Sequence, residues 1–586
     1  MSWLLKEKLQ KKLAAERGAA VYAPGARTGF ALAYPNTYHV GMSNLGFQII
    51  YREINSRGDT ACERVFLPDK RDEQEYHRTH TPLLTLETQR PLAEFPLIGF
   101  AVTFELDYFN ILKMLDLGRV PLLAVDRGEA DPIVIAGGPC ATFNPEPLTD
   151  FIDIFVIGEG EAVIHEILAA YYRGHLEGFS RAAIINRLAG LDGVYVPRCY
   201  TPEYNADGTL AALVPHDGAP SAVHRRWQRD IDAHPGQTAI STGDTEFGDM
   251  FLIEVARGCG RHCRFCMAGY CYRRPRVRSL ASLEKSLAQA AAVSRRVGLV
   301  GAAISDHPDI DALVARILDA GLTFSVASLR ADSVTPALMA GLAASGHKTV
   351  TLAPEAASER LRAVINKGIT DAHLAEAVAL AIRAGIPNVR LYIMVGLPGE
   401  DDSDIAAITD LARRVKSLMR QLGSGGKLTL SINPFIPKPF TPFQWLPMTA
   451  NRLVEARLKA VRAALKADKN IEILIEPPRE AYLQGALARG DRRQGAALLA
   501  AHRLGGAKAW PQALKQTGLD EDFYLYRQRR PDETLPWQHL DMGVKPAYLL
   551  QELDRALAGA ATPPCRPDCV RCGVCGGKAS KGGTAL

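Results

Sequence analysis

The repeating pattern of residues 250–433 constrains the fold more than any other feature of the chain. Short apolar runs alternate there with helical stretches such as DAHLAEAVALAIRAG, which ends at a glycine. The runs are FLIEVA (251–256), LVGAAIS (299–305), FSVASL (324–329), KTVTLAP (348–354), VRLYIMVG (389–396) and KLTLSIN (427–433). Repeated units of this kind favour parallel strands with helical crossovers. We therefore expect a partial (β/α)6 barrel whose chemistry lies at the carboxyl ends of its strands.

A second alternating region precedes this one. Its apolar runs end in Gly, Pro or polar residues and are FALAYP (30–35), LIGFAVTF (97–104), PIVIAGGP (132–139) and IDIFVIGEGE (152–161). Continuous apolar runs are typical of buried parallel strands, and the helical stretches between them predict a doubly wound, Rossmann-like sheet. Ligands of such sheets lie beyond the strand ends, here at Gly137-Gly138 and at 158–161. Glycines that only form tight turns are the alternative.

The 586 residues are too many for a single hydrophobic core. We expect an N-terminal helix and the Rossmann-like domain in residues 1–200, and a linker rich in Asn, Asp, Gly and Pro in 201–248. The partial barrel should occupy 249–450, and a mostly helical C-terminal region with a cysteine cluster should occupy 451–586. The overall fold class is thus α/β with a helical C-terminal region.

Composition places few limits on partners. The net charge of +5 is small for this length and both signs are interspersed, so nucleic acid is neither indicated nor excluded. The N-terminus shows no signal-peptide core, and no stretch reaches the roughly 18 apolar residues of a membrane span. A cytoplasmic location is the expectation.

Three cysteines follow the first expected barrel strand with the spacing C-x3-C-x2-C: Cys259, Cys263 and Cys266. Clustered cysteines indicate metal ligands rather than disulfides. Three thiolates leave one position of a cluster open, whereas a structural zinc site closes its shell with four ligands. His262 or Cys271 could complete such a zinc site, which is the alternative.

The stretch CGRHCRFC (259–266), including Phe265, resembles the motif of the radical S-adenosylmethionine (SAM) superfamily. This resemblance implies a [4Fe–4S] cluster whose open iron chelates SAM. One electron from the cluster would cleave SAM to methionine and a 5′-deoxyadenosyl radical, which abstracts hydrogen from substrate. A donor such as flavodoxin or ferredoxin is implied as a partner. The barrel is accordingly expected to be of the TIM type.

The same resemblance suggests where SAM would be bound. The segment IMVGLPGE (393–400) is similar to the family segment that cradles adenine, but AAISDHPD (302–309) stands where the family usually has Gly-Gly-Glu. The candidate cofactor-binding residues are Ser328, Arg330, Glu355, Val395, Gly396 and Gly399. Glu355 is equally well explained as a carboxylate at a helix N-terminus, and the two glycines as turn residues. No residue is assigned a catalytic acid–base role.

Four arginines follow the cysteine motif closely, at positions 273, 274, 276 and 278. They could form a basic rim that guides SAM or an anionic substrate. A solvated loop is an equally good interpretation.

The N-terminal half resembles the cobalamin-binding-like domain found upstream of many radical SAM barrels. The resemblance lies in IGFAVTFELDYFNILKMLDLGRVPL (98–122), AGGPCATFNPEPL (136–148) and DIFVIGEGEAV (153–163). The common cobalamin motif Asp-x-His-x-x-Gly is absent, and His39 does not have its context. Both a cobalamin-binding and a cofactor-free domain are therefore compatible with the sequence.

A second cluster, CRPDCVRCGVC, contains Cys565, Cys569, Cys572 and Cys575. Such closely spaced thiols resemble bacterial ferredoxin runs and predict a second [4Fe–4S] cluster. It would relay electrons, anchor substrate or donate sulfur. Zinc is the alternative.

Segments from YPNTYHVGMSNLGFQIIYREIN (34–55) to LPWQHLDMGVK (535–545) resemble an uncharacterised radical SAM family, for which no substrate is assigned. We therefore expect a radical SAM enzyme that performs a radical C–H modification, with cobalamin-dependent methyl transfer as one form. Sulfur insertion into RNA or protein, as in methylthiotransferases, is the alternative. A non-catalytic zinc or nucleic-acid binding protein is a minor one.

Overall fold

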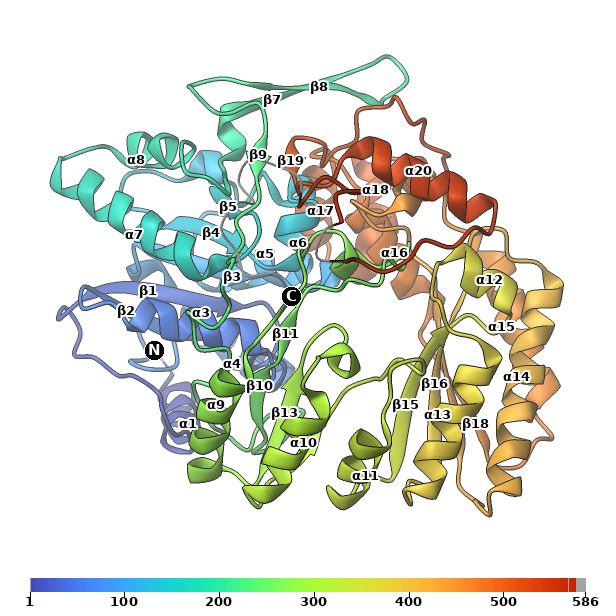
Figure 1. The fold of residues 1–586 in the computed structure, drawn as a ribbon. Coiled ribbons are helices and arrows are strands. Elements are labelled where there is room, and N and C mark those ends of the chain that lie inside the picture. The colour runs from blue at the N-terminus through green and yellow to red at the C-terminus, as the bar shows by residue number, and fades with distance from the viewer. Residues whose placement is uncertain (1, 567–568, 576–586) are drawn as a thin grey trace.

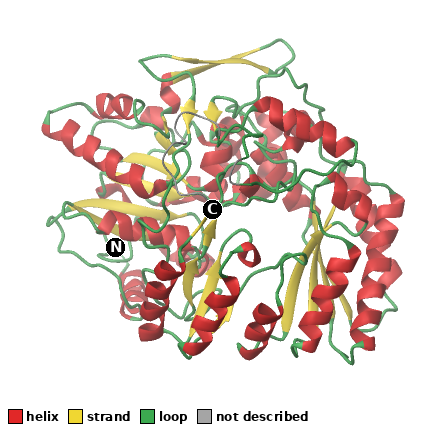
Figure 2. Ribbon diagram, in the orientation of Figure 1, coloured by secondary structure: helices red, strands yellow, loops and turns green. Residues whose placement is uncertain are grey.

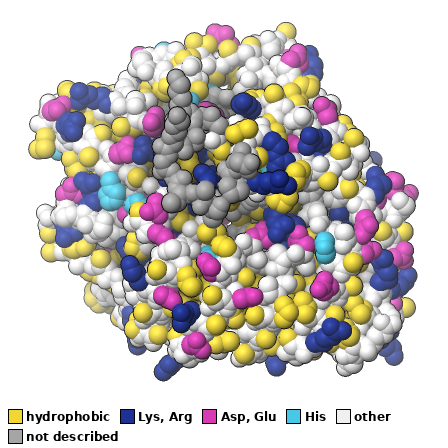
Figure 3. Space-filling model, viewed as in Figure 1, with side chains coloured by type: hydrophobic (Ala, Val, Ile, Leu, Met, Phe, Trp, Pro, Cys, Tyr) yellow, Lys and Arg dark blue, Asp and Glu magenta, His cyan; other side chains and the backbone are white. Residues whose placement is uncertain are grey.

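The computed structural model describes residues 2–566 and 569–575. Figure 1 shows an N-terminal α/β half beside a second α/β half, with the C-terminal helices lying over both. The helices lie mostly on the outside of the strands (Figure 2). Figure 3 shows charges of both signs scattered over one face, as the mixed composition leads one to expect.

The N-terminal half contains the expected doubly wound sheet. Its strand order is β2-β1-β3-β4-β5-β6, and the neighbours are parallel except for the antiparallel pair β5 and β6. The strands are β1 (Thr28–Tyr34), β2 (Thr60–Phe66), β3 (Leu97–Ala101), β4 (Ile133–Gly137), β5 (Ile154–Val156) and β6 (Val194–Tyr195). The order reverses between β1 and β3, and such a switch point is where doubly wound sheets bind ligands.

Helices cover both faces of this sheet. They are α1 (Trp3–Ala14), α2 (Tyr38–Met42), α3 (Leu45–Asn55), α4 (Lys70–Arg78), α5 (Tyr108–Leu117), α6 (Pro139–Phe143), α7 (Gly160–Leu176) and α8 (Arg181–Leu188). The apolar strands are buried on both faces, and Ile98, Val134 and Ile154 are fully inaccessible. This is why their sequences are continuously apolar rather than alternating.

The second half is the expected partial barrel, built from two parallel sheets. One contains β10 (Phe251–Glu254), β13 (Arg296–Val300) and β14 (Thr323–Ser325). The other contains β15 (Thr349–Glu355), β16 (Asn388–Val395), β17 (Leu428–Pro434) and β18 (Ile471–Ile475). A parallel bridge between Leu329 and Leu352 joins the two sheets. All six expected strands have counterparts, but two end earlier than expected: β13 ends at Val300 and β14 at Ser325, whereas the expected runs extended to 305 and 329.

β18 is a strand that the sequence analysis did not find, within the segment expected to be mostly helical. It pairs with β17 as a further parallel strand. Its residues alternate between partly buried and exposed because it lies at the sheet edge. The barrel helices are α9 (Leu280–Val293), α10 (Ile310–Asp319), α11 (Pro336–Ala344), α12 (Glu359–Val364), α13 (Asp371–Arg383), α14 (Asp402–Gln421) and α15 (Asn451–Leu465).

The segment expected as a linker contains a hairpin of β7 (Tyr200–Tyr204) and β8 (Leu210–Pro215). Beyond it, β9 (Val223–His224) pairs with β19 (Leu540–Asp541), so the C-terminal region is tied back to the N-terminal half. The C-terminal helices are α16 (Pro478–Ala488), α17 (Gln494–Arg503), α18 (Trp510–Thr517), α19 (Glu521–Leu525) and α20 (Pro546–Leu557). Within the described ranges, no helix combines the length and the apolar character needed to cross a bilayer.

Candidate functional site: the cysteine loop and the cavity beside it

The first cysteine cluster lies on a loop whose two ends are paired. β11 (Ala256–Arg257) and β12 (Arg276–Val277) form a short antiparallel pair directly after β10, and residues 258–275 form the loop between them. Gly258 begins the loop with φ = 78°. A Cβ at this position would lie 2.1 Å from the Tyr272 carbonyl oxygen, so the loop closes only with glycine here. The loop is therefore held at the carboxyl end of the first barrel strand, as expected.

Cys259, Cys263 and Cys266 lie close together on this loop. Cys263 is buried, and the other two are partly buried. Burial, together with the neighbouring thiols Cys263 and Cys259, raises the pKa of Cys266 to about 12. Burial and Cys263 likewise raise the pKa of Cys259. Thiols in such a setting need a cationic partner before they can be thiolates.

The donor set suits a cluster. A cubane binds each thiolate through a separate iron, so its ligands lie farther apart than those of one ion. Three nearby thiols on one short loop fit such a group.

Arg330 is one of the predicted SAM-binding residues, and it lies beside this loop. Its Nη1 is 3.8 Å from the Cys263 Sγ. The guanidinium is buried and is fixed by Asp332 at 2.9 Å and by the Lys367 carbonyl at 2.7 Å. A buried positive charge therefore lies beside one sulfur of the cysteine loop.

Glu355 and Lys367 form an ion pair of 3.2 Å next to the loop. Glu355 ends β15 with φ = 65°, where the register between β15 and β16 shifts. The Lys367 ammonium lies 5.9 Å from the centre of the Phe265 ring, and its charge acts to lower the pKa of Cys266. Lys367 is buried. Sequence reasoning assigned it no role, because it follows α12 within an ordinary NKG turn.

The remaining predicted residues lie at the neighbouring strand ends. Ser328 is partly buried in the segment after β14. Val395 is the last residue of β16, and Gly396 follows with φ = 92°. The Gly396 N–H donates to the Glu400 carboxylate at 2.9 Å, and Glu400 in turn pairs with Arg457. Gly399 accepts a hydrogen bond from Arg360 through its carbonyl. This turn is thus fixed by contacts of its own.

The arginines after the motif are neither a solvated loop nor a free basic rim. Three of them are buried, with exposed fractions of 1% for Arg273, 7% for Arg276 and 2% for Arg278. Arg276 pairs with Glu159 at 2.7 Å and Arg278 with Glu254 at 2.7 Å. Both interpretations fail for Arg276 and Arg278 because their acidic partners lie outside the loop. Arg274 is partly buried.

Glu159 belongs to the Gly-Glu-Gly-Glu turn before α7, one of the two places where the sequence predicts a ligand-binding edge of the sheet. Its carboxylate forms ion pairs with Arg276 and with Arg257, the latter at 3.0 Å. Arg257 additionally pairs with Glu161 at 2.7 Å and Glu254 at 2.8 Å. The acidic turn of the N-terminal sheet is therefore clamped to both ends of the cysteine loop.

A cavity of about 530 Å³ lies between the two halves at this junction. The N-terminal sheet contributes residues at its switch point, including Leu32, Gly99, Phe100 and Gly137. The barrel contributes residues that include Gly258, Ala268, Tyr272 and Gly301. The cavity thus connects the predicted ligand edge of the sheet with the cysteine loop.

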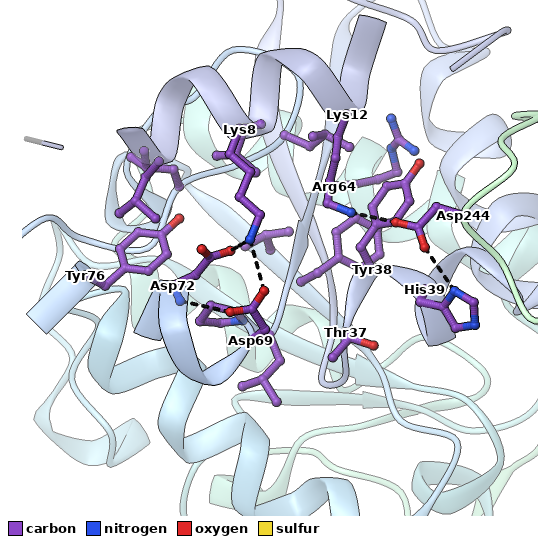
Figure 4. A pocket seen from close by; sticks show the side chains of 18 residues that line it. Lys8, Lys12, Thr37, Tyr38, His39, Arg64, Asp69, Asp72, Tyr76 and Asp244 are labelled. Atoms are coloured by element: carbon purple, nitrogen blue, oxygen red, sulfur yellow. Dashed lines mark hydrogen bonds and ion pairs between the residues drawn. The ribbon is translucent and has the colours of Figure 1, made fainter. Parts of the chain in front are cut away.

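A smaller pocket of about 320 Å³ lies beside α1 (Figure 4). Lys8 reaches Asp69 at 3.0 Å and Asp72 at 2.5 Å. Lys12 and His39 both reach Asp244, at 2.7 and 3.0 Å. His39 therefore lines this pocket and is not among the residues that line the cavity between the halves. The two lysine pairs thus tie α1 to the start of α4 and to the loop that contains Asp244.

The second cysteine cluster packs against the first. Cys565 donates its backbone N–H to the Gly260 carbonyl at 2.9 Å, and its Sγ lies 3.2 Å from His262 Nε2. Burial, followed by the charges of Arg273, Arg571 and Arg264, lowers the pKa of His262 to about 2, so this side chain is neutral. Cys271 is buried as well.

Comparison with known proteins agrees with this geometry. Residues 46–197 match the family model of the N-terminal region of radical SAM proteins, and residues 253–412 match that of the radical SAM superfamily. An uncharacterized protein of Methanocaldococcus jannaschii is 30% identical over 464 residues, which are 79% of this chain and 88% of that protein. The chain belongs to the radical SAM superfamily. It is accordingly a SAM-dependent iron–sulfur enzyme.

This radical SAM protein is also similar to an uncharacterized methyltransferase of Pyrococcus horikoshii, with 26% identity over 321 residues, 52% of this chain and 62% of that protein. Among solved structures, the radical SAM methyltransferase TsrM of Kitasatospora setae, with cobalamin and a [4Fe–4S] cluster bound, aligns with a TM-score of 0.47 and 15% identity. That alignment covers 84% of this chain and 99% of TsrM. The cobalamin-dependent radical enzyme OxsB, with aqua-cobalamin and SAM bound, aligns with a TM-score of 0.46 and 12% identity. It covers 91% of this chain and 79% of OxsB.

Proposed function

We propose that Cys259, Cys263 and Cys266 hold the [4Fe–4S] cluster of this enzyme and that SAM binds at the adjacent strand ends. Support comes from the position of the loop at the carboxyl end of β10 and from the thiols being close together. When bound, the cluster supplies the electron that cleaves SAM. Arg330 and Lys367 place two cationic groups beside the thiolates and so offset the charge of the cluster.

The proposed SAM-binding residues follow from the same arrangement. Glu355 lies beside Lys367 at the end of β15, and it pairs in register with Ile393 of β16. The neighbouring strand β16 ends at Val395, after which Gly396 and Gly399 form the turn. Ser328 and Arg330 follow β14, one strand to the other side. These residues therefore lie at the ends of consecutive strands, and Arg330 and the Glu355–Lys367 pair are the ones beside the cysteine loop.

We further propose that the cavity between the halves binds cobalamin. Its volume of about 530 Å³ lies within the range of roughly 300–1,000 Å³ that is typical of ligand sites. The lining is mainly apolar and rich in glycine, so a flat macrocycle could approach the backbone closely. Its residues lie at the switch point of the sheet, where doubly wound folds bind ligands.

The composition of the cavity lining bears on how cobalamin would be held. Among the described residues that line it there is neither a histidine nor a methionine. The residues therefore fit a cobalamin that is held by its ring and side chains rather than through a protein–cobalt bond. When bound, cobalamin supplies a methyl carrier beside the cysteine loop. The ion pair between Glu159 and Arg257 would hold the two cofactor sites at a fixed separation.

The function that this geometry supports best is a radical C–H modification by methyl transfer. The observation that carries it is the cavity, because it brings the ligand edge of the N-terminal sheet to the cysteine loop. A cluster alone would require no such cavity.

The test is anaerobic purification from cells supplied with hydroxocobalamin, followed by iron, sulfide and corrinoid analysis. We expect cobalamin to co-purify, and Gly137→Leu to lose it while keeping the iron of the cysteine loop. A Cβ at Gly137 meets only Val156, at an ordinary 3.7 Å, so the added side chain would enter the cavity rather than strain the fold. The control is Gly425→Leu, at an exposed loop glycine with nothing within 4 Å of its Cβ position. Cobalamin that is absent from the wild type, or equally bound by Gly137→Leu, would refute the cobalamin assignment.

A further inference from the structure

The C-terminal cysteines are placed directly against the loop of the first cluster. The Cys565 backbone N–H donates to Gly260, which lies between Cys259 and Cys263. The Cys565 Sγ lies 3.2 Å from His262, the residue before Cys263. Cys572 is buried, and its carbonyl accepts from the Lys545 N–H just before α20. Residues 303 positions apart in the chain thus form one continuous structure.

The surroundings of Arg273 indicate that an anion binds between the two groups of cysteines. Its side chain is buried, and its Nη1 has no hydrogen-bond partner among the described residues. A buried guanidinium N–H without a partner is costly, so such groups normally meet an acceptor. The neighbours that act on Arg273 most strongly are Cys565 and Cys572. A cluster bound by four thiolates carries net negative charge and provides the missing acceptor.

His262 connects the two groups of cysteines in a defined orientation. The Arg273 Nη2 lies 2.6 Å from His262 Nδ1, and the Tyr548 hydroxyl lies 2.7 Å from the same nitrogen. A guanidinium can only donate, so Nδ1 accepts and the ring proton is on Nε2. The Nε2–H therefore donates to the Cys565 Sγ. Donors of this kind to ligand sulfurs tune the potential of iron–sulfur clusters.

We propose that Cys565, Cys569, Cys572 and Cys575 bind a second [4Fe–4S] cluster that passes single electrons to the SAM cluster through His262. The proposal rests on the proposed function only in placing the SAM cluster on Cys259, Cys263 and Cys266. The path runs from the Cys565 sulfur across the hydrogen bond to His262, and then through one peptide bond to Cys263.

The electrons balance in single steps. A reduced flavodoxin or ferredoxin gives one electron to the second cluster, whose charge falls from 2+ to 1+. The second cluster then returns to 2+ as the SAM cluster is reduced from 2+ to 1+. No bond is formed or broken in this transfer, and no proton is required.

The exposure of the cysteines fits electron transfer from the second cluster to the SAM cluster. Cys569 is partly buried, and the next residue, Val570, is 62% exposed. Arg571, with its Nε 3.2 Å from the Cys569 Sγ, adds a positive charge near this edge. Cys263, at the other end of the path, is buried. A protein donor can therefore reach the second cluster directly, and an acidic one is favoured.

The first experiment is metal analysis of anaerobically reconstituted full-length protein. We expect roughly eight irons per chain in the wild type and roughly four in Cys569→Ala/Cys572→Ala, because each cubane contains four. Cys199→Ala, which changes a buried cysteine of the N-terminal half, is the matched control and should retain all the iron. Roughly four irons with one zinc in the wild type, or unchanged iron in the double variant, would overturn the proposal. This measurement requires neither SAM nor turnover, so its outcome is independent of the proposed reaction.

The second experiment separates relay from the other roles. SAM cleavage is measured with reduced ferredoxin and, in parallel, with dithionite, a small reductant that can reach the SAM cluster without a relay. In Cys569→Ala/Cys572→Ala we expect the ferredoxin-driven rate to fall far more than the dithionite-driven rate. Equal falls would overturn the relay. Absence of cleavage by the wild type with either donor would instead refute the proposed function.

The third experiment tests His262 by electron paramagnetic resonance. In the wild type with both clusters reduced, we expect spectral broadening from coupling between two nearby paramagnets. His262→Leu should lower the midpoint potential of the second cluster, and His262→Gln, which keeps a side-chain N–H, should partly restore it. Two uncoupled signals, or a potential that is unchanged in His262→Leu, would contradict the proposal.

Discussion

Arg257 and Glu159 join the two halves of the molecule through an ion pair of 3.0 Å in which both side chains are largely buried. Arg257 precedes the glycine that opens the cysteine loop, and Glu159 lies in the turn before α7. Burial alone would raise the pKa of Glu159, but Arg276 and Arg257 outweigh it, and the pKa is lowered. The carboxylate is therefore charged and acts as a fixed anchor for the loop.

Glu159→Gln should destabilise the protein by about 3 kcal/mol, because it leaves buried guanidinium charge without its full compensation. Chemical denaturation measures this directly, and iron retention should fall in parallel. Glu177→Gln serves as the control, since Glu177 pairs with Arg187 at an exposed site. Its effect should stay within about 1 kcal/mol. Similar effects of the two substitutions would contradict the anchoring role.

Asp107 predicts a specific pH dependence of stability. Burial raises its pKa to about 6, despite hydrogen bonds from Asn36 and Asn110. Because the ordinary value is 3.8, the folded state binds the proton more tightly than the unfolded state, so this group lowers stability as pH rises from about 4 to above 6. Asp107→Asn should abolish this loss and gain on the order of 2 kcal/mol at pH 7. Unfolding free energies at pH 4 and pH 7 test it, with the exposed Asp319→Asn as control. A gain of the same size at both pH values would contradict it.

Lys367→Met should lower the midpoint potential of the cluster on the first cysteine loop. The substitution removes a buried positive charge that acts on Cys266, and reduction of the cluster adds negative charge there. It also leaves Glu355 without its ion-pair partner. A redox titration followed by electron paramagnetic resonance measures the shift. Lys367→Arg keeps the charge and should restore most of the potential; if it behaves like Lys367→Met, charge is not the cause.

Gly258→Ala should prevent the cysteine loop from closing. The positive φ of this residue and the 2.1 Å approach of a Cβ to the Tyr272 carbonyl both oppose it, at a cost of well over about 1 kcal/mol. We expect loss of iron from Cys259, Cys263 and Cys266. Gly269→Ala lies on the same loop with nothing within 4 Å of its Cβ position and is the matched control. Full iron content in Gly258→Ala would show that the loop tolerates a different path.

The sequence was most informative where a local pattern decides the structure. The apolar runs predicted the doubly wound sheet and the barrel strands because burial on both faces requires such runs. The motif of Cys259, Cys263 and Cys266 marked the strand end that carries the loop. β18 was not predicted because its sequence, IEILI, shows only a weak alternation of apolar and polar residues and lies between helices.

The sequence was least informative where partners are distant. Arg276 appears as part of a basic loop until Glu159, 117 residues earlier, is placed beside it. Arg264 is buried against Glu552, 288 residues later. Lys367 acquires its role only because the fold brings β15 and the cysteine loop together. No local pattern contains such contacts, since they depend on how the two halves pack.

The contact of Cys565 with His262 also has a consequence for biosynthesis. The ribosome completes the first cysteine loop about 300 residues before it reaches the segment that covers it. Until then Cys565 cannot cover that loop. A chain that stops before residue 565 keeps the loop but lacks the cysteines through which we propose that electrons enter. Such a fragment would bind its first cluster but would have no route for electrons from a protein donor. Because SAM cleavage needs such an electron, an incomplete chain would not generate radicals with that donor.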